Sequence, residues 1–254
     1  MTEAAQACIG GFHAVEAALG NVPTLRRIWL AEGRDDARAR GVADEAVRQG
    51  VPVERAPMAR LDELLPEVRH QGCVAECEIA QPRRESELPA ILEAVEQPWV
   101  LALDQVQDPH NLGACLRTAA AAGVSAVIAP RKRAAGLSPA VRKVAAGAAE
   151  RVPFVPVTNL ARALGRLQTD GYWVVGLDAQ APASLYDTAL PERLVLVAGG
   201  EAGGLRALTQ RQCDGCVAIP MAADVESLNV SVATGITLFE AVRQRAMAGT
   251  TSTD

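Results

Sequence analysis

Glycine, glutamate, serine and asparagine gather in the last third of the chain, in a pattern that suits ligand binding and catalysis. Leu194–Ala198 is an uninterrupted apolar run, typical of a strand buried on both faces, and two glycines, Glu201 and two further glycines follow it within residues 199–204. Glycine permits positive φ values and lets the backbone approach a ligand closely. Val217–Pro220 predicts a second short strand, so two strand ends carry these residues.

A helix is predicted to follow the second strand, with Ser227 or Asn229 as its N-cap. In an open α/β sheet, strand ends and helix starts of this kind converge on a crevice that binds ligands. Each residue alone also fits an ordinary turn or a solvated loop. The glycines match neither a Rossmann fingerprint nor a phosphate-binding loop. The expected inner face of the helix comprises Val232, Ile236, Phe239 and Val242.

A second group of polar residues closes the loop after the predicted strand Trp99–Leu103. This loop contains the segment Asp108–Gly113, with Asn111 inside it, and Arg117 lies one turn into the next helix. Taken singly, Asn111 fits a helix cap and Arg117 fits a surface charge. His110 is a candidate general base, although a solvent-exposed histidine is the simpler interpretation.

Composition limits the class of protein. The 254 residues are 49% hydrophobic, which allows a sizeable core, and no apolar stretch reaches membrane-span length. The N-terminus lacks a secretion signal, so a cytoplasmic protein is expected. The net charge of −5 argues against indiscriminate polyanion binding but allows a local basic patch. The pair Cys213 and Cys216, with Cys73 and Cys77, has zinc-like spacing, but we expect structural thiols and no metal.

The alternation of predicted strands and helices divides the chain into two α/β domains. Residues 1–80 are expected to form a small α/β sandwich of three helices and three strands, and residues 81–97 a Pro-bounded linker with a short helix. Residues 98–247 are expected to form a mostly parallel sheet with helices on both faces, and residues 248–254 a disordered tail.

Three blocks of the second domain, taken together, resemble the three motifs of the SpoU-type SPOUT methyltransferases. Asp108–Arg117 resembles the DPxNxGxxxR motif, Gly199–Gly204 the GxExxG loop, and Ile219–Met221 with Ser227–Ser231 the IPM…SLNVS segment. Lys143–Ala148 resembles the segment between motifs, although Ala145 stands where a serine is common.

The resemblance extends over nearly the whole chain. Gly11–Val15 and His70–Gly72 are similar to elements of the N-terminal RNA-binding domain of these enzymes, which has a fold of the ribosomal protein L30e type. The resemblance implies a trefoil knot in the second domain and S-adenosylmethionine bound within it. It also implies a homodimer with the site near the interface.

Roles for individual residues follow from the same resemblance. It implies that the residues facing the reacting ribose are Arg117, Asn111, Glu201, Ser227 and Asn229. The residues expected to contact the cofactor are Gly199, Gly200, Gly204, Ile219, Met221 and Leu228. A basic segment suits RNA phosphates, although a solvated helix face is the commoner interpretation of such a run, and its residues are Arg131, Lys132, Arg133, Arg142 and Lys143.

The implied activity is S-adenosylmethionine-dependent 2′-O-methylation of a guanosine ribose in 23S rRNA. One alternative is a catalytically silent RNA-binding factor for ribosome assembly, although retention of Arg117, Glu201 and Asn229 argues against it. Another is a SpoU-type tRNA 2′-O-methyltransferase. A dinucleotide oxidoreductase is disfavoured because the chain lacks the GxGxxG fingerprint.

Overall fold

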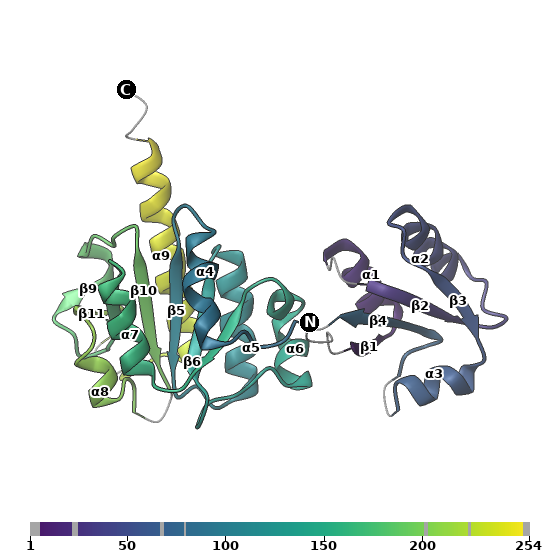
Figure 1. Ribbon diagram of the computed structural model, residues 1–254, viewed down its shortest axis with the longest axis horizontal. Helices are drawn as coiled ribbons and strands as arrows, with labels where there is room; N and C mark the ends of the chain where they lie inside the picture. The colour runs from purple at the N-terminus through teal and green to yellow at the C-terminus, as the bar shows by residue number, and fades with distance from the viewer. Residues whose placement is uncertain are drawn as a thin grey trace. The chain divides into compact units, whose positions relative to one another are not determined.

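The computed structural model describes residues 6–21, 25–66, 69–78, 80–200, 203–222 and 225–250. The chain divides into two compact units, Met1–Gln81 and Pro82–Asp254 (Figure 1). Residues 82–97, expected as a linker, belong to the second unit, where Leu88 and Leu92 of helix α4 (Leu88–Glu93) are buried. The apolar residues of this Pro-bounded stretch therefore pack against the sheet of the second unit.

The first unit is a four-stranded sheet with helices on both faces. The strand order is β1-β4-β2-β3, in which β2 and β3 are parallel and the other pairs are antiparallel. The strands are β1 (Gln6–Gly10), β2 (Leu25–Ala31), β3 (Val53–Ala56) and β4 (Cys73–Glu78). The helices are α1 (Phe12–Asn21), α2 (Ala37–Arg48) and α3 (Met58–Leu64). Strand β1 is additional to the three predicted strands.

Alternation along β2 supplies both faces of this sheet. Ile28 and Leu30 pack in one cluster with Phe12 and Val42 of helices α1 and α2, whereas α3 packs on the other face through Leu61. Asp36 caps α2, because its side chain accepts hydrogen bonds from the backbone N–H groups of two residues in the first turn. Val47 of α2 is 71% exposed.

The two segments of this unit that carry the family resemblance lie side by side. The Gly11 N–H donates to the Cys73 carbonyl at 2.9 Å, and a methyl group at Gly10 would lie 2.7 Å from Cβ of His70. The buried His70 ring accepts from the Gly72 N–H at 3.1 Å through Nδ1, while its Nε2 lies 2.8 Å from an Asp62 carboxylate oxygen. The His70–Gly72 segment thus fastens the turn against the start of α1.

The second unit is a seven-stranded, entirely parallel sheet in the order β7-β6-β5-β10-β8-β11-β9. Its strands are β5 (Trp99–Asp104), β6 (Ala126–Pro130), β7 (Phe154–Val157), β8 (Trp173–Leu177), β9 (Ala183–Ser184), β10 (Leu194–Gly199) and β11 (Gly215–Ala218). Its longer helices are α5 (Pro109–Ala121), α6 (Pro139–Ala145), α7 (Leu160–Thr169) and α9 (Val230–Thr250). The short ones are α8 (Ala207–Gln210), η1 (Glu85–Glu87), η2 (Ala148–Glu150) and η3 (Leu185–Asp187).

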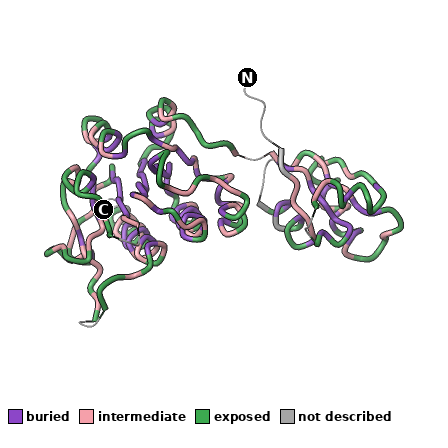
Figure 2. The backbone as a smooth tube through the Cα atoms, turned by 90° about the horizontal axis from the view of Figure 1, so that it is seen from below, coloured by how far each residue is buried: buried purple, intermediate pink, exposed green. Residues whose placement is uncertain are grey.

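Helices cover both faces of this sheet, as predicted. Side chains of α5, α6 and α9 pack with one face in a large apolar cluster, and those of α4 and α7 pack with the other. The central strands β5 and β10 are therefore buried on both sides, which explains their continuous apolar sequences. Figure 2 shows buried stretches of backbone, in purple, inside the second unit. The sequence analysis did not identify β7 or α7.

Helix α9 differs from its prediction in two ways. Its buried residues include Val230, Leu238 and Ala241, whereas Val232 and Phe239, expected on the inner face, are 49% and 50% exposed. It also continues to Thr250, past residue 247 where a disordered tail was expected to follow. In the described part of the chain, none of the helices has the length and apolar character needed to cross a membrane.

Candidate functional site

The glycine segment after β10 is held so tightly that two of its positions admit only glycine. A methyl group at Gly199 would lie 2.1 Å from the carbonyl carbon of Gly204, and one at Gly200 would lie 2.5 Å from the Gln105 carbonyl oxygen. Gly204 itself has a φ of +62°, a left-handed conformation that favours glycine. The chain therefore turns back on itself here with direct backbone contact, and the Gly204 N–H donates to the Gly200 carbonyl at 3.1 Å.

A buried carboxylate at the end of β5 secures this turn. Asp104 is completely buried, and its side chain accepts hydrogen bonds from the Arg206 backbone N–H at 3.0 Å and from Arg206 Nε at 2.7 Å. Its carbonyl accepts from the Gly200 N–H at 2.8 Å. Asp104 was not among the predicted site residues, although a charged residue at the end of an apolar strand can indicate a functional position.

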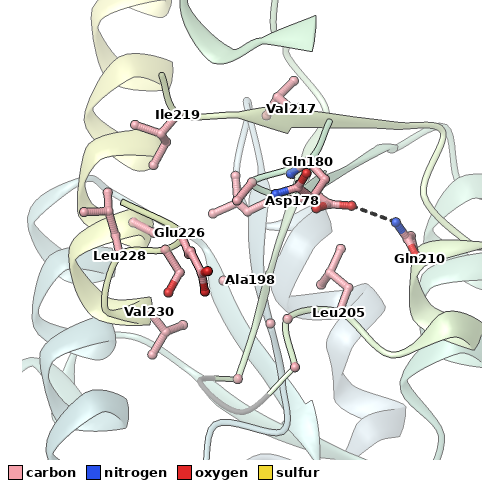
Figure 3. A pocket seen from close by; sticks show the side chains of 18 of the residues that line it. Asp178, Gln180, Ala198, Leu205, Gln210, Val217, Ile219, Glu226, Leu228 and Val230 are labelled. Carbon is pink, nitrogen blue, oxygen red and sulfur yellow. Dashed lines mark hydrogen bonds between the residues drawn. The ribbon is translucent and has the colours of Figure 1, made fainter. Parts of the chain in front are cut away.

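A cavity of about 610 Å³ opens between this turn, the ends of β8 and β11, and the start of α9 (Figure 3). Its apolar wall includes Leu177, Leu205 and Val217. Ser227 lines the cavity. So do all the residues expected to contact a cofactor, which are Gly199, Gly200, Gly204, Ile219, Met221 and Leu228. The structure therefore brings together residues separated by more than twenty positions in the sequence.

Two carboxylates that the sequence analysis did not select also line the cavity. Asp178 follows β8, and its side chain accepts from Gln210 Nε2 and from the Gln180 N–H, at 2.8 Å and 2.9 Å (Figure 3). Glu226 is exposed and extends into the same space. The described lining contains no Lys, Arg or His, so the cavity is electrostatically suited to a cationic ligand.

Asn111 and Asn229, far apart in the sequence, form a direct hydrogen bond. Asn229 Nδ2 donates to Asn111 Oδ1 at 3.0 Å, and Asn111 Nδ2 donates to Asp108 Oδ2 at 3.3 Å. Asp108, and not Asn111, caps α5, because its other oxygen accepts from the His110 N–H at 2.9 Å. These hydrogen bonds lower the pKa of the Asp108 carboxyl, the backbone bond most strongly. A continuous polar chain thus joins the start of α5 to the start of α9.

Asn229 also settles which residue caps α9. Its Oδ1 accepts from the Ser231 N–H at 2.9 Å and from the Ser231 hydroxyl at 2.6 Å. Ser227, the other candidate cap, lines the cavity instead. Because Leu228 and Val230 on either side of Asn229 also line the cavity, the polar chain lies next to it.

Arg117 lies apart from these groups. Its side chain is exposed on α5, and within the described residues it has neither a hydrogen bond nor an ion pair. Helix α5 packs against α9 close to this position, since a methyl group at Gly235 would lie 3.7 Å from Thr118 Cγ2. Glu201, the remaining predicted catalytic residue, falls outside the described residues.

The basic segment contains exposed and buried charges. Arg131, Lys132, Arg133 and Lys143 are exposed, which suits contact with phosphates. Arg142 is largely buried and forms an ion pair with Glu150. It is therefore less suited to phosphate contact than its neighbours.

The cysteines are buried or partly buried. Burial raises the pKa of Cys213 to about 12 and that of Cys73 also to about 12, whereas metal binding needs a thiolate. Cys73 and Cys213 belong to different units of the chain. Across the described residues there is no group of three or more His, Cys, Asp or Glu side chains placed to hold a metal ion.

Comparison with known proteins identifies related sequences over both units. Residues 98–239 match the family model of the SpoU rRNA Methylase family, and residues 8–83 match that of "RNA 2'-O ribose methyltransferase substrate binding". The chain is 50% identical over 239 residues to a protein from Xanthomonas campestris named 23S rRNA (guanosine-2'-O-)-methyltransferase RlmB, covering 93% of this chain and 96% of that one. The protein of the same name from Escherichia coli K12 is 47% identical over 238 residues, covering 93% and 98%.

Solved structures share the fold. The SpoU methyltransferase AviRb from Streptomyces viridochromogenes, solved in complex with AdoMet, superposes with a TM-score of 0.75 at 24% identity, covering 96% of this chain and 92% of that one. An RNA methyltransferase of the TrmH family from Porphyromonas gingivalis, itself described as putative, gives a TM-score of 0.68 at 27% identity, covering 92% and 88%.

Proposed function

The chain belongs to the SpoU rRNA methylase family, and from this we propose that it transfers the methyl group of S-adenosylmethionine to the 2′-hydroxyl of a guanosine in 23S rRNA. The observation that carries the proposal is the identity of 47–50%, over nearly the full length of both chains, to proteins named for this activity. The two matched family models cover a methylase unit and a substrate-binding unit, which are the parts that such an enzyme needs.

The cavity fits S-adenosylmethionine in shape and in charge. Its narrow backbone turn, apolar wall and acidic side chains suit a ligand with a flat base, a thioether-like chain and a positive sulfonium. When bound, the sulfonium supplies an activated methyl group. Backbone groups of Gly199 and of Ile219–Met221 are proposed to hold the cofactor, with Gly200, Gly204 and Leu228 beside it.

The proposed catalytic residues act on the ribose and its phosphate. Displacement at a methyl carbon requires the 2′-oxygen to be held in line with the methyl group; as the O–C bond forms and the S–C bond breaks, S-adenosylhomocysteine leaves and the hydroxyl proton passes to the adjacent phosphate or to water. The Asn111–Asn229 pair is proposed to hold the start of α9 and to present amide groups to the ribose, with Ser227 on the neighbouring cavity wall. Glu201 lies outside the described residues, and its role is proposed from the family resemblance alone. An arginine guanidinium stays protonated in proteins, so Arg117 is proposed to grip a phosphate and stabilise negative charge on the 2′-oxygen.

The RNA is proposed to contact both units. The first unit is assigned to substrate binding through its family match, and the exposed basic residues Arg131, Lys132, Arg133 and Lys143 are assigned to phosphate contacts. Arg142 is retained only as a support for this segment, because Glu150 pairs with it. Because the proposed substrate is bacterial-type 23S rRNA, we propose that the protein acts in the cytoplasm.

We also propose a homodimer and a trefoil knot. An apolar stripe of α9 that includes Val232 and Phe239 is exposed, and α9 packs against α5, which carries Arg117. A second copy that covers this stripe brings Arg117 into a partly buried setting near a site. The knot is proposed from the family to which the chain belongs; in the sheet, the later strand β10 lies between β5 and β8.

Methyl transfer to defined RNA tests the proposal and its alternatives. Purified protein, tritiated S-adenosylmethionine and rRNA from a strain lacking this protein are combined, and the labelled nucleotide is mapped. Label on a guanosine of 23S rRNA supports the proposal. Label on tRNA alone supports a tRNA 2′-O-methyltransferase. RNA binding without transfer, on rRNA and on pre-ribosomal particles, supports a silent assembly factor.

A further inference from the structure

We propose that Asp104 is a positioning residue for the cofactor site, which fixes the glycine turn from both ends before any ligand binds. This inference rests on the proposed function, since it assigns a role within the proposed cofactor cavity. Asp104 ends β5, and in the sheet its register partner is Gly199, the last residue of β10. The turn that follows Gly199 lines the cavity.

The contacts of Asp104 reach the beginning and the end of this turn. At the beginning, the Asp104 carbonyl accepts the Gly200 N–H at 2.8 Å. At the end, the carboxylate accepts hydrogen bonds from the Arg206 N–H at 3.0 Å and from Arg206 Nε at 2.7 Å, and it forms an ion pair in which Nη2 lies 2.7 Å from Oδ1. One residue of a central strand therefore determines where both ends of the turn lie.

Burial makes these contacts hard to replace. The Asp104 side chain is 0% exposed, while that of Arg206 is 42% exposed, so in the folded chain the carboxylate is shielded from water and depends on Arg206 for its hydrogen bonds. An uncompensated buried charge is strongly unfavourable, and the structure must shift to relieve it. Gly199 packs closely against Gly204, and Gly200 packs closely against Gln105. A shift of Asp104 or Arg206 is therefore expected to move the glycine turn, which forms part of the cavity wall.

The closing experiment compares Asp104→Asn, Arg206→Ala and Arg206→Lys with a matched control, Glu240→Gln. Glu240 is also a buried carboxylate held by a half-exposed arginine, Arg243, with side chains 6% and 54% exposed, and it does not line the cavity. The full-length proteins are titrated calorimetrically with S-adenosylmethionine well below their unfolding temperatures, and kcat and KM for the cofactor are measured.

We expect Asp104→Asn and Arg206→Ala to weaken cofactor binding by about tenfold or more, in line with the loss of a buried charged partner. Arg206→Lys keeps the charge and the backbone N–H, so it should recover part of the affinity. Glu240→Gln should lower the unfolding temperature while its Kd stays within about twofold of wild type, as expected for a distant site.

A purely structural role for Asp104 predicts a different result. In that case all the variants lose thermal stability, yet the folded proteins bind the cofactor with wild-type Kd, and the inference is overturned. If Asp104→Asn does not fold, Arg206→Ala decides the matter, because its half-exposed position and retained backbone N–H favour folding. Failure of the wild-type protein to bind S-adenosylmethionine would contradict the proposed function instead.

Discussion

The cofactor cavity and the proposed catalytic residues differ in how completely a single chain assembles them. The cavity wall is made by one unit, and its glycine turn is fixed by hydrogen bonds to Asp104 and by contacts that exclude any side chain. Among the proposed catalytic residues, Asn111 and Asn229 are paired, but Arg117 is exposed and has no partner among the described residues. We therefore propose that a single folded chain binds the cofactor, whereas catalysis needs a further component that engages Arg117.

The largest effect is expected at Arg117, on catalysis alone. Arg117→Ala and Arg117→Lys should each reduce kcat by roughly 10²–10³, because both lose the bidentate fork that stabilises charge on the 2′-oxygen and grips phosphate. The Kd for S-adenosylmethionine, measured calorimetrically, should stay near wild type, since Arg117 does not line the cavity.

A general-base role for Arg117 predicts a separate pattern. The wild-type rate would then climb with pH, and Arg117→Lys would recover activity at high pH. Such a recovery would exclude the electrostatic role, and near-normal activity of Arg117→Ala would remove Arg117 from the site.

A substitution in the glycine turn is expected to weaken cofactor binding, whereas the Arg117 variants are expected to affect catalysis. Gly199→Ala places a methyl group 2.1 Å from the Gly204 carbonyl carbon, so the turn must open. Overpacking of this kind costs about 1–3 kcal/mol, and if the bound form bears this cost the cofactor affinity falls by about five- to 150-fold. Gly215→Ala is the control, because nothing lies within 4 Å of its added methyl group. Equal Kd values for the two variants would show that the turn does not shape the cofactor site.

Much of the fold follows from local sequence, because fully buried strands leave a plain apolar signature. The predicted strands Trp99–Leu103 and Leu194–Ala198 each end one residue before the observed β5 and β10. The expected inner face of α9 was right for Ile236 and Val242, which pack against the core, and wrong for Val232 and Phe239, which are exposed. The helix instead buries Thr234, Thr237 and Glu240. Their polar groups are satisfied by Cys115, by the Ala233 carbonyl, and by Arg243 with Gln244, so apolar periodicity did not identify them as buried.

The motifs in the sequence predicted those site residues that line the cavity directly, but not the residues that hold them in place. All the expected cofactor residues line it. Asp104 and Asp178 act through partners that lie 102 and 32 positions away, Arg206 and Gln210, and no local pattern encodes such pairs. Asp108 shows the same limit at short range. Asn111 taken singly fits a helix cap, but Asp108 caps α5 and the Asn111 side chain pairs with Asn229.

The apolar stripe of α9 tests whether a second copy completes the catalytic region. Phe239→Asp places a charge on an exposed apolar face and should weaken self-association by about thirtyfold or more, as for an aromatic residue at the centre of an interface. Sedimentation of the variant should show monomers at assay concentration. Methyl-transfer activity should fall in proportion to the loss of dimer, and the cofactor affinity measured by calorimetry should fall less than the activity.

A matched substitution on another surface controls for charge and hydrophobicity. Val47 is 71% exposed on α2 of the first unit, and Val47→Asp should leave the association state unchanged. A wild-type protein that sediments as an active monomer would contradict the dimer. A dimeric Phe239→Asp variant would place the interface elsewhere.

The smallest effect is expected at Asp178, and it concerns which cofactor form the cavity prefers. S-adenosylmethionine carries a sulfonium charge that S-adenosylhomocysteine lacks, so a carboxylate in the cavity favours the substrate over the product. Asp178 is half-buried, and a partly exposed ion pair contributes about 0.2–1 kcal/mol, or less than about sixfold in affinity. Asp178→Asn should therefore weaken S-adenosylmethionine by about threefold to fivefold and S-adenosylhomocysteine by less. Calorimetric titration with both ligands at low and high salt provides the measurement, because screening should reduce the preference. Equal weakening of both ligands would assign Asp178 to holding Gln180 and Gln210 in place, with no electrostatic selection by the cavity.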